Sequence, residues 1–416
     1  MKDTQLYERM LGLEKPWSVE SVRLERELES IVVKVRCHKT VWVCPDTRQR
    51  VHVHGYEKRR WRHLDTCQYK TIIEADVPRL KYPDGKTRML DVPWAEGSSR
   101  FSCLFERLAI DLLLSCSVND ASAILRIGWD AADAIKSRAV ARGLLRSKDE
   151  VPERICIDEK SFRRGHDYVT CVAEVGPDGK ARVLHVSDDR KEESLVEFFS
   201  RYEPEQLKGI KAASVDMWKP YLKALKRHLP GWQTKVSHDP FHLMGHMNKA
   251  VNETRKSEHA QLRAKGDQRL KATRQLWLYG EENLTDSMLD RFDALKDITL
   301  KTGRAWSIKE FFREFLRCSN KPEAQECFKL WHQWACRCKL PAVQKVARMF
   351  KKHLSLILNY FVHHLTNGPI EGLNNKIQSL VKKAYGFRNK ERFKTDILFH
   401  LGGLDMNPAY ISHAKS

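Results

Sequence analysis

Three acidic residues that lie far apart in the chain, Asp158, Asp216 and Glu371, have the surroundings expected of metal-binding carboxylates. Asp158 follows the strand-like run 155–157, and Asp216 follows the small and β-branched run 211–215. Mg²⁺ and Mn²⁺ prefer carboxylates over thiolates or imidazoles. Two such ions suit phosphodiester chemistry, in which one activates the attacking water or 3′-hydroxyl and the other stabilises the leaving oxygen.

Glu371 falls in the first turn of a predicted helix, because Asn367 and Pro369 are typical helix-start residues. A polar stripe at spacings of four, three and four runs along that helix: Glu371, Asn375, Gln378 and Lys382. We expect Glu371 to be the third carboxylate, with Asn375 and Lys382 beside it. The alternative is a solvated glutamate favoured by the helix dipole.

A second group of candidate ligands follows the run 231–239, which we predict to be a strand. His238, His242 and His246 then recur at helical spacing along one face. The segment lacks the glutamate between two histidines that a zinc peptidase needs. We therefore favour Asp239 and His242 as residues that line the main carboxylate site over a separate zinc cluster.

The segments around the aspartates predict a mixed sheet. Runs 153–160 and 168–175 form a hairpin, and the Pro-Asp-Gly turn at 177–179 leads into a third strand at 182–186. A helix at 192–199 and a strand at 211–218 follow. Strands that alternate with helices indicate an α/β fold whose chemistry gathers at strand ends.

Two further regions predict helices. Almost all of 248–361 is helical in pattern, with its tryptophans in the core. Upstream, helices at 99–114, 121–125 and 131–142, with a Gly-containing turn at 127–130, predict a helix-turn-helix. On its last helix we expect Lys136, Arg138 and Arg142 to contact DNA, the alternative being a plain three-helix packing unit.

The first hundred residues predict a small β module with strand runs at 19–36, 41–43 and 51–53. Cys44 and Cys67 are candidate zinc ligands there, although the segment after Cys44 supplies one thiol where a zinc knuckle has two. Ordinary buried cysteines are the alternative. Three arginines surround an aromatic residue in the same module, a pattern that suits phosphate contact with stacking or a solvated charge run: Arg59, Arg60, Trp61 and Arg62.

Composition indicates a polyanionic partner. Of 416 residues, 74 are Lys or Arg and 54 are Asp or Glu, which gives a net charge of +20. Dispersed positive charge attracts phosphate over long range, so nucleic acid is the first choice. The chain has neither the roughly 18 apolar residues in a row of a membrane helix nor a signal-peptide pattern, and we expect a cytoplasmic protein with reduced cysteines and no membrane partner.

Together these motifs resemble one family, the DDE transposases of bacterial insertion sequences, specifically the ISL-three family with its ribonuclease-H-like catalytic domain. The resemblance covers nearly the whole chain after about residue 40. It depends on the segments 61–67, 92–95, 157–162, 188–190, 216–218, 239–242, 276–279, 367–374 and 386–389. Within these stand Ile157-Asp158-Glu159-Lys160, Asp188-Asp189-Arg190 and Pro369-Ile370-Glu371-Gly372.

The resemblance implies that Asp158, Asp216 and Glu371 are the catalytic triad and that 248–360 is a helical insertion before the last acid. It implies action on double-stranded DNA, both inverted-repeat ends and target, as a homodimer or higher oligomer at the bacterial nucleoid. It also implies an N-terminal zinc region. There the chain departs from the pattern, because ligand positions hold Thr47, Tyr82 and Asp84.

The expected domains are a β module at 1–98, a helix-turn-helix at 99–148, a catalytic core at 149–247 and 361–416, and the helical insertion at 248–360. Cations near the catalytic motifs are expected to contact DNA: Lys160, Arg163, Arg164, Lys382, Lys383 and Arg388. Two alternatives remain: a catalytically silent DNA-binding regulator, and a ribonuclease-H-type nuclease or resolvase that cuts but does not join.

Overall fold

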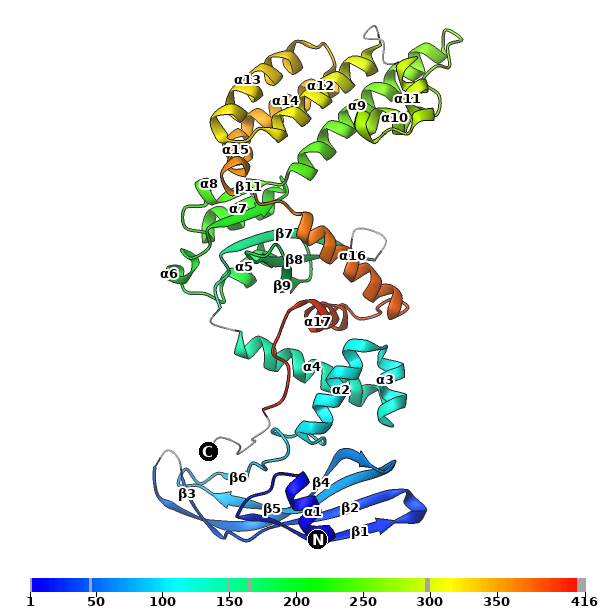
Figure 1. The fold of residues 1–416 in the computed structure, drawn as a ribbon. Coiled ribbons are helices and arrows are strands. Elements are labelled where there is room, and N and C mark those ends of the chain that lie inside the picture. The colour runs from blue at the N-terminus through cyan, green and yellow to red at the C-terminus, as the bar shows by residue number, and fades with distance from the viewer. Residues whose placement is uncertain (1, 45–46, 148–149, 164–166, 296–299, 410–416) are drawn as a thin grey trace. The chain divides into compact units, whose positions relative to one another are not determined.

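The computed structural model describes residues 2–44, 47–147, 150–163, 167–295 and 300–409 (Figure 1). The chain divides into two compact units. One unit contains residues 1–147 together with the C-terminal segment from 404, and the other contains residues 148–403. The chain therefore leaves the first unit, builds the whole second unit and returns to the first.

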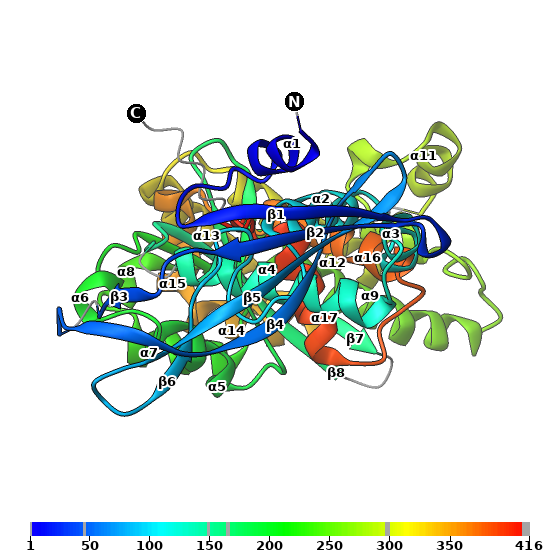
Figure 2. The same cartoon turned by 90° about the horizontal axis from the view of Figure 1, so that it is seen from below.

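The first unit is built on a six-stranded sheet within the described residues, with strand order β1-β2-β5-β4-β3 and β6 paired to β5. Strands β1, β2, β5 and β4 run side by side in Figure 2. Only the β2–β5 pair among these is parallel. The elements are α1 (Asp3–Met10), β1 (Trp17–Glu25), η1 (Arg26–Leu28), β2 (Ser30–Cys37), β3 (Val41–Val43), β4 (Arg50–Thr66), β5 (Tyr69–Lys81) and β6 (Thr87–Met89).

Three tryptophans form the centre of this unit's core. The Trp94 ring meets those of Trp17 and Trp61 edge to face, at centroid distances of 5.0 and 5.3 Å. Such aromatic pairs contribute about 0.5–1.5 kcal/mol beyond the area that they bury. The segment around Trp94 therefore fixes the sheet to the helices that follow it.

Those helices are α2 (Cys103–Ser115), α3 (Val118–Leu125) and α4 (Trp129–Arg146). Ser102 and Ser117 cap α2 and α3, each accepting a backbone N–H three residues on. Arg126, at φ 54°, ends α3 and lets the chain turn into α4. The prediction of a helix-turn-helix is confirmed. The C-terminal segment packs on α4, since Arg142 Nη1 donates to the Met406 carbonyl at 2.6 Å.

The second unit contains a five-stranded sheet within the described residues, with order β11-β10-β7-β8-β9. Strands β7 (Arg154–Arg163), β8 (Asp167–Val175) and β9 (Ala181–Ser187) are antiparallel, whereas β10 (Ala212–Val215) and β11 (Val236–His238) add in parallel beside β7. The β8–β9 turn uses Gly179 at φ 76°. The predicted strand 231–239 is corrected: Gly231 starts the short helix α8 (Trp232–Lys235), and only 236–238 pair.

Helices cover both faces of this sheet. Ile155, Ile157 and Val215 pack on α5 (Glu192–Phe199) and α7 (Lys219–His228), with α6 (Pro204–Leu207) nearby in sequence. Cys156 and Ala212 pack instead with α16 (Gly368–Lys383) and α17 (Lys390–Leu401). Alternate residues of each strand therefore face different helices, as the pleat requires.

In the described part of the chain, seven α-helices between the sheet's last strand and α16 share their own aromatic-rich core. Phe312, Trp331 and Phe350 lie at its centre, with ring centroids 4.8 to 5.9 Å apart. The helices are α9 (Pro240–Arg263), α10 (Arg274–Leu278), α11 (Asp286–Asp293), α12 (Lys301–Arg317), α13 (Lys321–Arg337), α14 (Pro341–Lys352) and α15 (Leu354–His363), with η2 (Glu281–Asn283). The predicted mixed α/β fold with a large helical section is confirmed. No described helix has the length and apolarity to cross a bilayer.

Candidate active site

The sheet places Asp158 and Asp216 next to each other. Strands β7 and β10 pair in parallel with Ile157 opposite Val215, so the next residue on each is an aspartate. Neighbouring strands lie about 4.8 Å apart, and in-register side chains point to the same face. Because Ile157 and Val215 pack on the α5–α7 face, both carboxylates turn toward α16.

The imidazole of His242, near the start of α9, lies between the two carboxylates. Its Nε2 is 3.9 Å from Asp158 Oδ1, and its Nδ1 is 3.8 Å from Asp216 Oδ1. Burial raises the pKa of the Asp158 carboxyl, while the Glu159 N–H and His242 act in the opposite direction. The His242 ring thus lies between Asp158 and Asp216, where two carboxylates would attract a cation.

Asp239 is the next residue in the same register, because β11 pairs with β10 at His238 and Val215. Its carboxylate is 1% exposed and fully engaged. Oδ2 accepts the His242 N–H at 3.2 Å and so caps α9, and Oδ1 accepts the Asn367 N–H at 2.9 Å just before α16. Asp239 therefore positions the two helices that carry His242 and Glu371.

Helix α16 contributes a side chain that the sequence prediction missed. Asn374 Nδ2 donates to Asp158 Oδ2 at 2.8 Å, and Lys160 Nζ donates to the Asn374 carbonyl at 3.0 Å. Glu371 is half-buried one turn earlier, on the same helix face because residues at i and i+3 are neighbours. The predicted neighbour Asn375 is instead exposed, so that prediction is corrected by one position.

The prediction that Lys382 supports this site is also corrected. It lies eleven residues beyond Glu371, about 16 Å along the helix at 1.5 Å per residue. Its side chain is exposed in the last turn of α16. Lys160, by contrast, lies beside the site, and burial lowers the pKa of its ammonium group.

The donor set at the strand ends fits a divalent ion of the Mg²⁺ type. Asp158 and Asp216 supply hard oxygens from adjacent strands, and Asn374 braces one of them. Among the described residues, no three His, Cys, Asp or Glu side chains already form one metal-binding group. Two carboxylates are thus in place for an ion, and Glu371 stands on the helix next to them.

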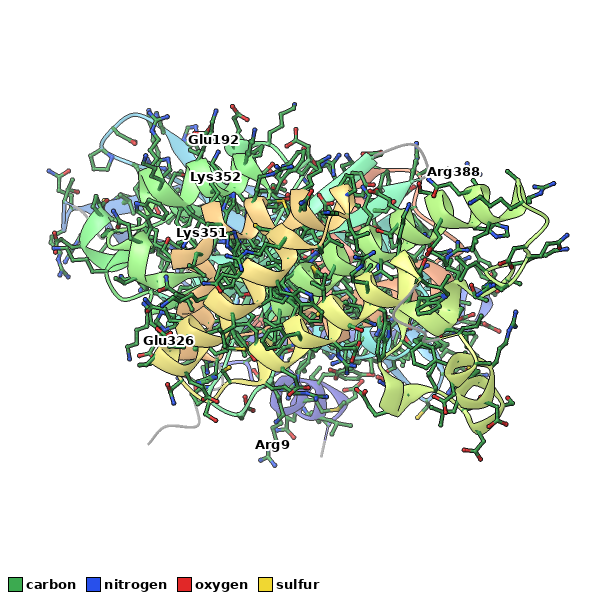
Figure 3. All side chains as sticks on the ribbon, turned by 90° about the horizontal axis from the view of Figure 1, so that it is seen from above. Arg9, Glu192, Glu326, Lys351, Lys352 and Arg388 are labelled. Carbon is green, nitrogen blue, oxygen red and sulfur yellow. The ribbon has the colours of Figure 1, made fainter. Side chains whose placement is uncertain are left out.

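The other cations of this unit differ in their availability. Arg163 stacks on Phe162 at 4.9 Å and donates to the Arg388 carbonyl at 2.6 Å. Lys382 and Arg388 are exposed, and Lys383 is half-buried. Figure 3 labels Arg388 among the side chains. Arg164 lies outside the described residues.

Two of the predicted DNA contacts in the β module, Trp61 and Arg62, are corrected because their side chains lie mostly inside the module. Trp61 is 1% exposed in the core, so its ring cannot stack on a base. Arg62 pairs with Asp65, and burial lowers the pKa of its guanidinium to about 10. Arg59 lies over the Trp61 ring at 5.3 Å and bonds to the Ser98 carbonyl. Arg60 keeps an exposed side chain near Glu74.

Two of the three predicted contacts on α4, Lys136 and Arg142, are also corrected because their side chains lie mostly inside the unit, whereas the Arg138 side chain is 38% exposed. Lys136 is 3% exposed, with its Nζ 3.3 Å from Asp133. Arg138 and Arg142 both pair with the buried Glu106 of α2. These ion pairs brace α4 against α2, so base or phosphate contact would have to come from Arg138 or from other side chains of the motif.

The cysteine pair suggested as a zinc site is not brought together. Cys44 directly follows β3 and is buried with Val51 and Leu80, whereas Cys67 is exposed in the turn after β4. The strand between them has 17 residues and spans about 55 Å at 3.3 Å per residue. Near Cys44, the position that holds Tyr82 carries an aromatic ring under the Arg88 guanidinium, 4.7 Å away, and Arg88 pairs with Asp84. These residues do not fit a bound zinc ion.

A sheet with carboxylates at its strand ends, joined to a helix-turn-helix unit, defines an enzyme that acts on DNA through carboxylate chemistry. Sequence comparison gives the particular family. Residues 155–397 match the DDE transposase domain of the ISL3 type. Residues 40–85 match the zinc-finger of transposase IS204/IS1001/IS1096/IS1165, and residues 90–140 match the helix-turn-helix domain of transposase family ISL3. The chain belongs to the ISL3 family of DDE transposases.

Two relatives extend the similarity over most of the chain. The transposase for insertion sequence element IS1557 of Mycobacterium tuberculosis is 24% identical over 434 aligned residues, which cover 97% of this chain and 96% of the relative. The transposase for IS1001 of Bordetella parapertussis is 26% identical and covers 82% of this chain and 84% of the relative. The predicted class of enzyme, a DDE transposase, is confirmed.

Proposed function

We propose that this transposase binds the terminal inverted repeats of its insertion sequence and cleaves and joins DNA strands with Asp158, Asp216 and Glu371 as its catalytic acids. The observation that carries the proposal is the register of β7 and β10, which aligns Asp158 with Asp216 on the face covered by α16. The Asn374–Asp158 hydrogen bond supports Glu371 as the third acid, because it fixes the helix one turn beyond that residue.

The three acids would hold two Mg²⁺ or Mn²⁺ ions, which supply an activated attacking oxygen and a stabilised leaving oxygen in phosphodiester chemistry. Asp158 and Asp216 hold fixed positions on neighbouring strands, and the His242 ring lies between them. Glu371 enters from α16, whose start is fixed by Asp239. Binding of DNA and metal together would draw Glu371 in to complete the set.

The test is cleavage and joining of a labelled DNA end of the element with Mg²⁺ or Mn²⁺. Asp158→Asn, Asp216→Asn and Glu371→Gln are each expected to lower both activities at least about 10³-fold, because each removes a ligand charge. End binding should change little. Glu326→Gln on α13, labelled in Figure 3, is the matched control because its side chain is 73% exposed and pairs only at 3.8 Å with Lys329.

Full activity in any of the three variants would refute the assignment of that residue. End binding without cleavage under either metal would favour a DNA-binding regulator, and cleavage without joining would favour a nuclease or resolvase. We also propose that the active form on DNA is a homodimer or higher oligomer, by inference from the ISL3 family. Light scattering of the enzyme with and without the DNA end tests this part separately.

A further inference from the structure

The motif Asp188-Asp189-Arg190 contains none of the three proposed catalytic acids. Several contacts nevertheless fix the side chain and backbone of its arginine. The Arg190 guanidinium carbon is 4.7 Å from the centroid of the Tyr168 ring and 4.7 Å from that of Trp218. A cation enclosed by two aromatic faces is fixed in orientation and can bond only through its edges.

The edges of this guanidinium are only partly used. Nη1 donates to Glu159 at 3.2 and 3.3 Å, and the side chain is still 34% exposed. Arginine carries five N–H donors in a planar fork that matches a phosphate oxygen pair. The described contacts of the side chain therefore leave donors for a ligand with paired anionic oxygens.

The surrounding loop keeps the fork in place. The Trp218 indole Nε1 donates to the Arg190 carbonyl at 2.9 Å, and the Ser194 hydroxyl donates to Asp189 Oδ1 at 2.6 Å. Thr170 also donates to the Asp189 carbonyl. An arginine needed only for a surface ion pair would not require this fastening, since exposed pairs contribute about 0–1 kcal/mol.

The position relates this arginine to the proposed catalytic acids. Glu159 follows Asp158 on β7 and points to the opposite face of the strand, and Trp218 comes two residues after Asp216. Arg190 thus lies at the same end of the strands as the acids but on the opposite face of the sheet, which α5 and α7 cover. Because every nucleotide of a DNA strand carries a phosphate, a strand crossing this end of the sheet would bring a phosphate near the cut to Arg190.

We propose that Arg190, clamped by Tyr168 and Trp218, is a binding site for a backbone phosphate of the DNA strand near the scissile bond. This inference rests on the proposed function. The phosphate belongs either to the element's end or to the flanking or target strand, and the experiment separates these sources.

The test uses DNA in which single phosphates near the cut are replaced by uncharged methylphosphonates, on the element side or on the flanking side. For the unmodified enzyme, one position is expected to weaken end binding or target capture about tenfold. The Arg190→Gln enzyme should already bind unmodified DNA about tenfold more weakly than the wild type. The methylphosphonate that weakens wild-type binding should weaken binding by this variant by less than about twofold more. Such non-additivity is expected only for a direct contact.

Arg190→Lys, which keeps the charge but loses the fork, should retain part of the effect and guards against misfolding of the first variant. Arg317→Gln on α12, which removes a charge from a 58% exposed arginine, should leave the methylphosphonate profile unchanged. Equal penalties in the wild type and Arg190→Gln at every position would overturn the proposal. Binding is measured in Ca²⁺ without cleavage, so the result stands apart from the fate of the catalytic acids.

Discussion

Asn374 and Asp158 are 216 positions apart in the chain, yet the amide of the first donates a 2.8 Å hydrogen bond to the carboxylate of the second. This bond fixes both the orientation of one proposed catalytic acid and the rotation of α16. Asn374→Ala removes a hydrogen bond to a half-buried charged group, which contributes roughly 1.5–3 kcal/mol. We expect cleavage to fall about 10- to 100-fold, with end binding unchanged. Asn375→Ala, one residue away and exposed, should stay near the wild-type rate.

Asp239→Asn should affect both stability and rate. An asparagine can accept one of the two backbone N–H groups but presents its own N–H to the other, inside a 1% exposed site. A buried donor left unpaired costs about 1–3 kcal/mol. We expect a lower urea midpoint and a loss of cleavage that added Mn²⁺ does not restore. Recovery at high Mn²⁺ would show that Asp239 binds metal directly.

Acid should destabilise the protein between about pH 6.5 and pH 4. Burial lowers the pKa of His63, His185 and His238 to about 4. Between these values the unfolded chain binds more protons, so the free energy of unfolding falls as pH decreases, by up to about 3 kcal/mol per histidine. Urea unfolding at several pH values measures this slope. His63→Asn, which can still bond Ser102, should flatten it, whereas exposed His54→Asn should not.

The β module should fold without zinc. Cys44 packs with apolar residues, and the Tyr82, Asp84 and Arg88 side chains contact one another where the family's pattern places ligands. We expect EDTA to abolish strand cleavage. The melting temperature of the protein should be the same before and after EDTA treatment. Elemental analysis of the purified protein checks the same point: one tightly bound zinc per chain, with melting lowered on its removal, would contradict this prediction.

Most elements of the fold follow from local patterns in the sequence. The Pro-Asp-Gly turn and β-branched runs predict β7, β8 and β9, and the short helices with a Gly-containing turn at 127–130 predict the helix-turn-helix. The two aspartates could be placed at strand ends for the same reason. The register that aligns them could not be predicted, because the pairing of β7 with β10 joins segments more than fifty residues apart.

The errors arose where a side chain's partner lies far away in the sequence. Arg142 looks like a DNA contact until Glu106, 36 positions earlier, pairs with it. The helical pattern alone does not distinguish Asn374 from Asn375. Packing of α16 on the sheet brings Asn374 to Asp158 and leaves Asn375 exposed. Trp61 lies among arginines in the sequence, but strand alternation turns its ring into the core.

The carboxylate of Asp239 has a last consequence for how such an enzyme can change. It fastens the chain where α9 departs and again, 128 positions later, where α16 begins. The helical section between these points thus begins and ends at backbone N–H groups that both donate to the Asp239 carboxylate. Changes in the size of this helical section would therefore alter the surface that the transposase presents to DNA without moving the proposed catalytic acids.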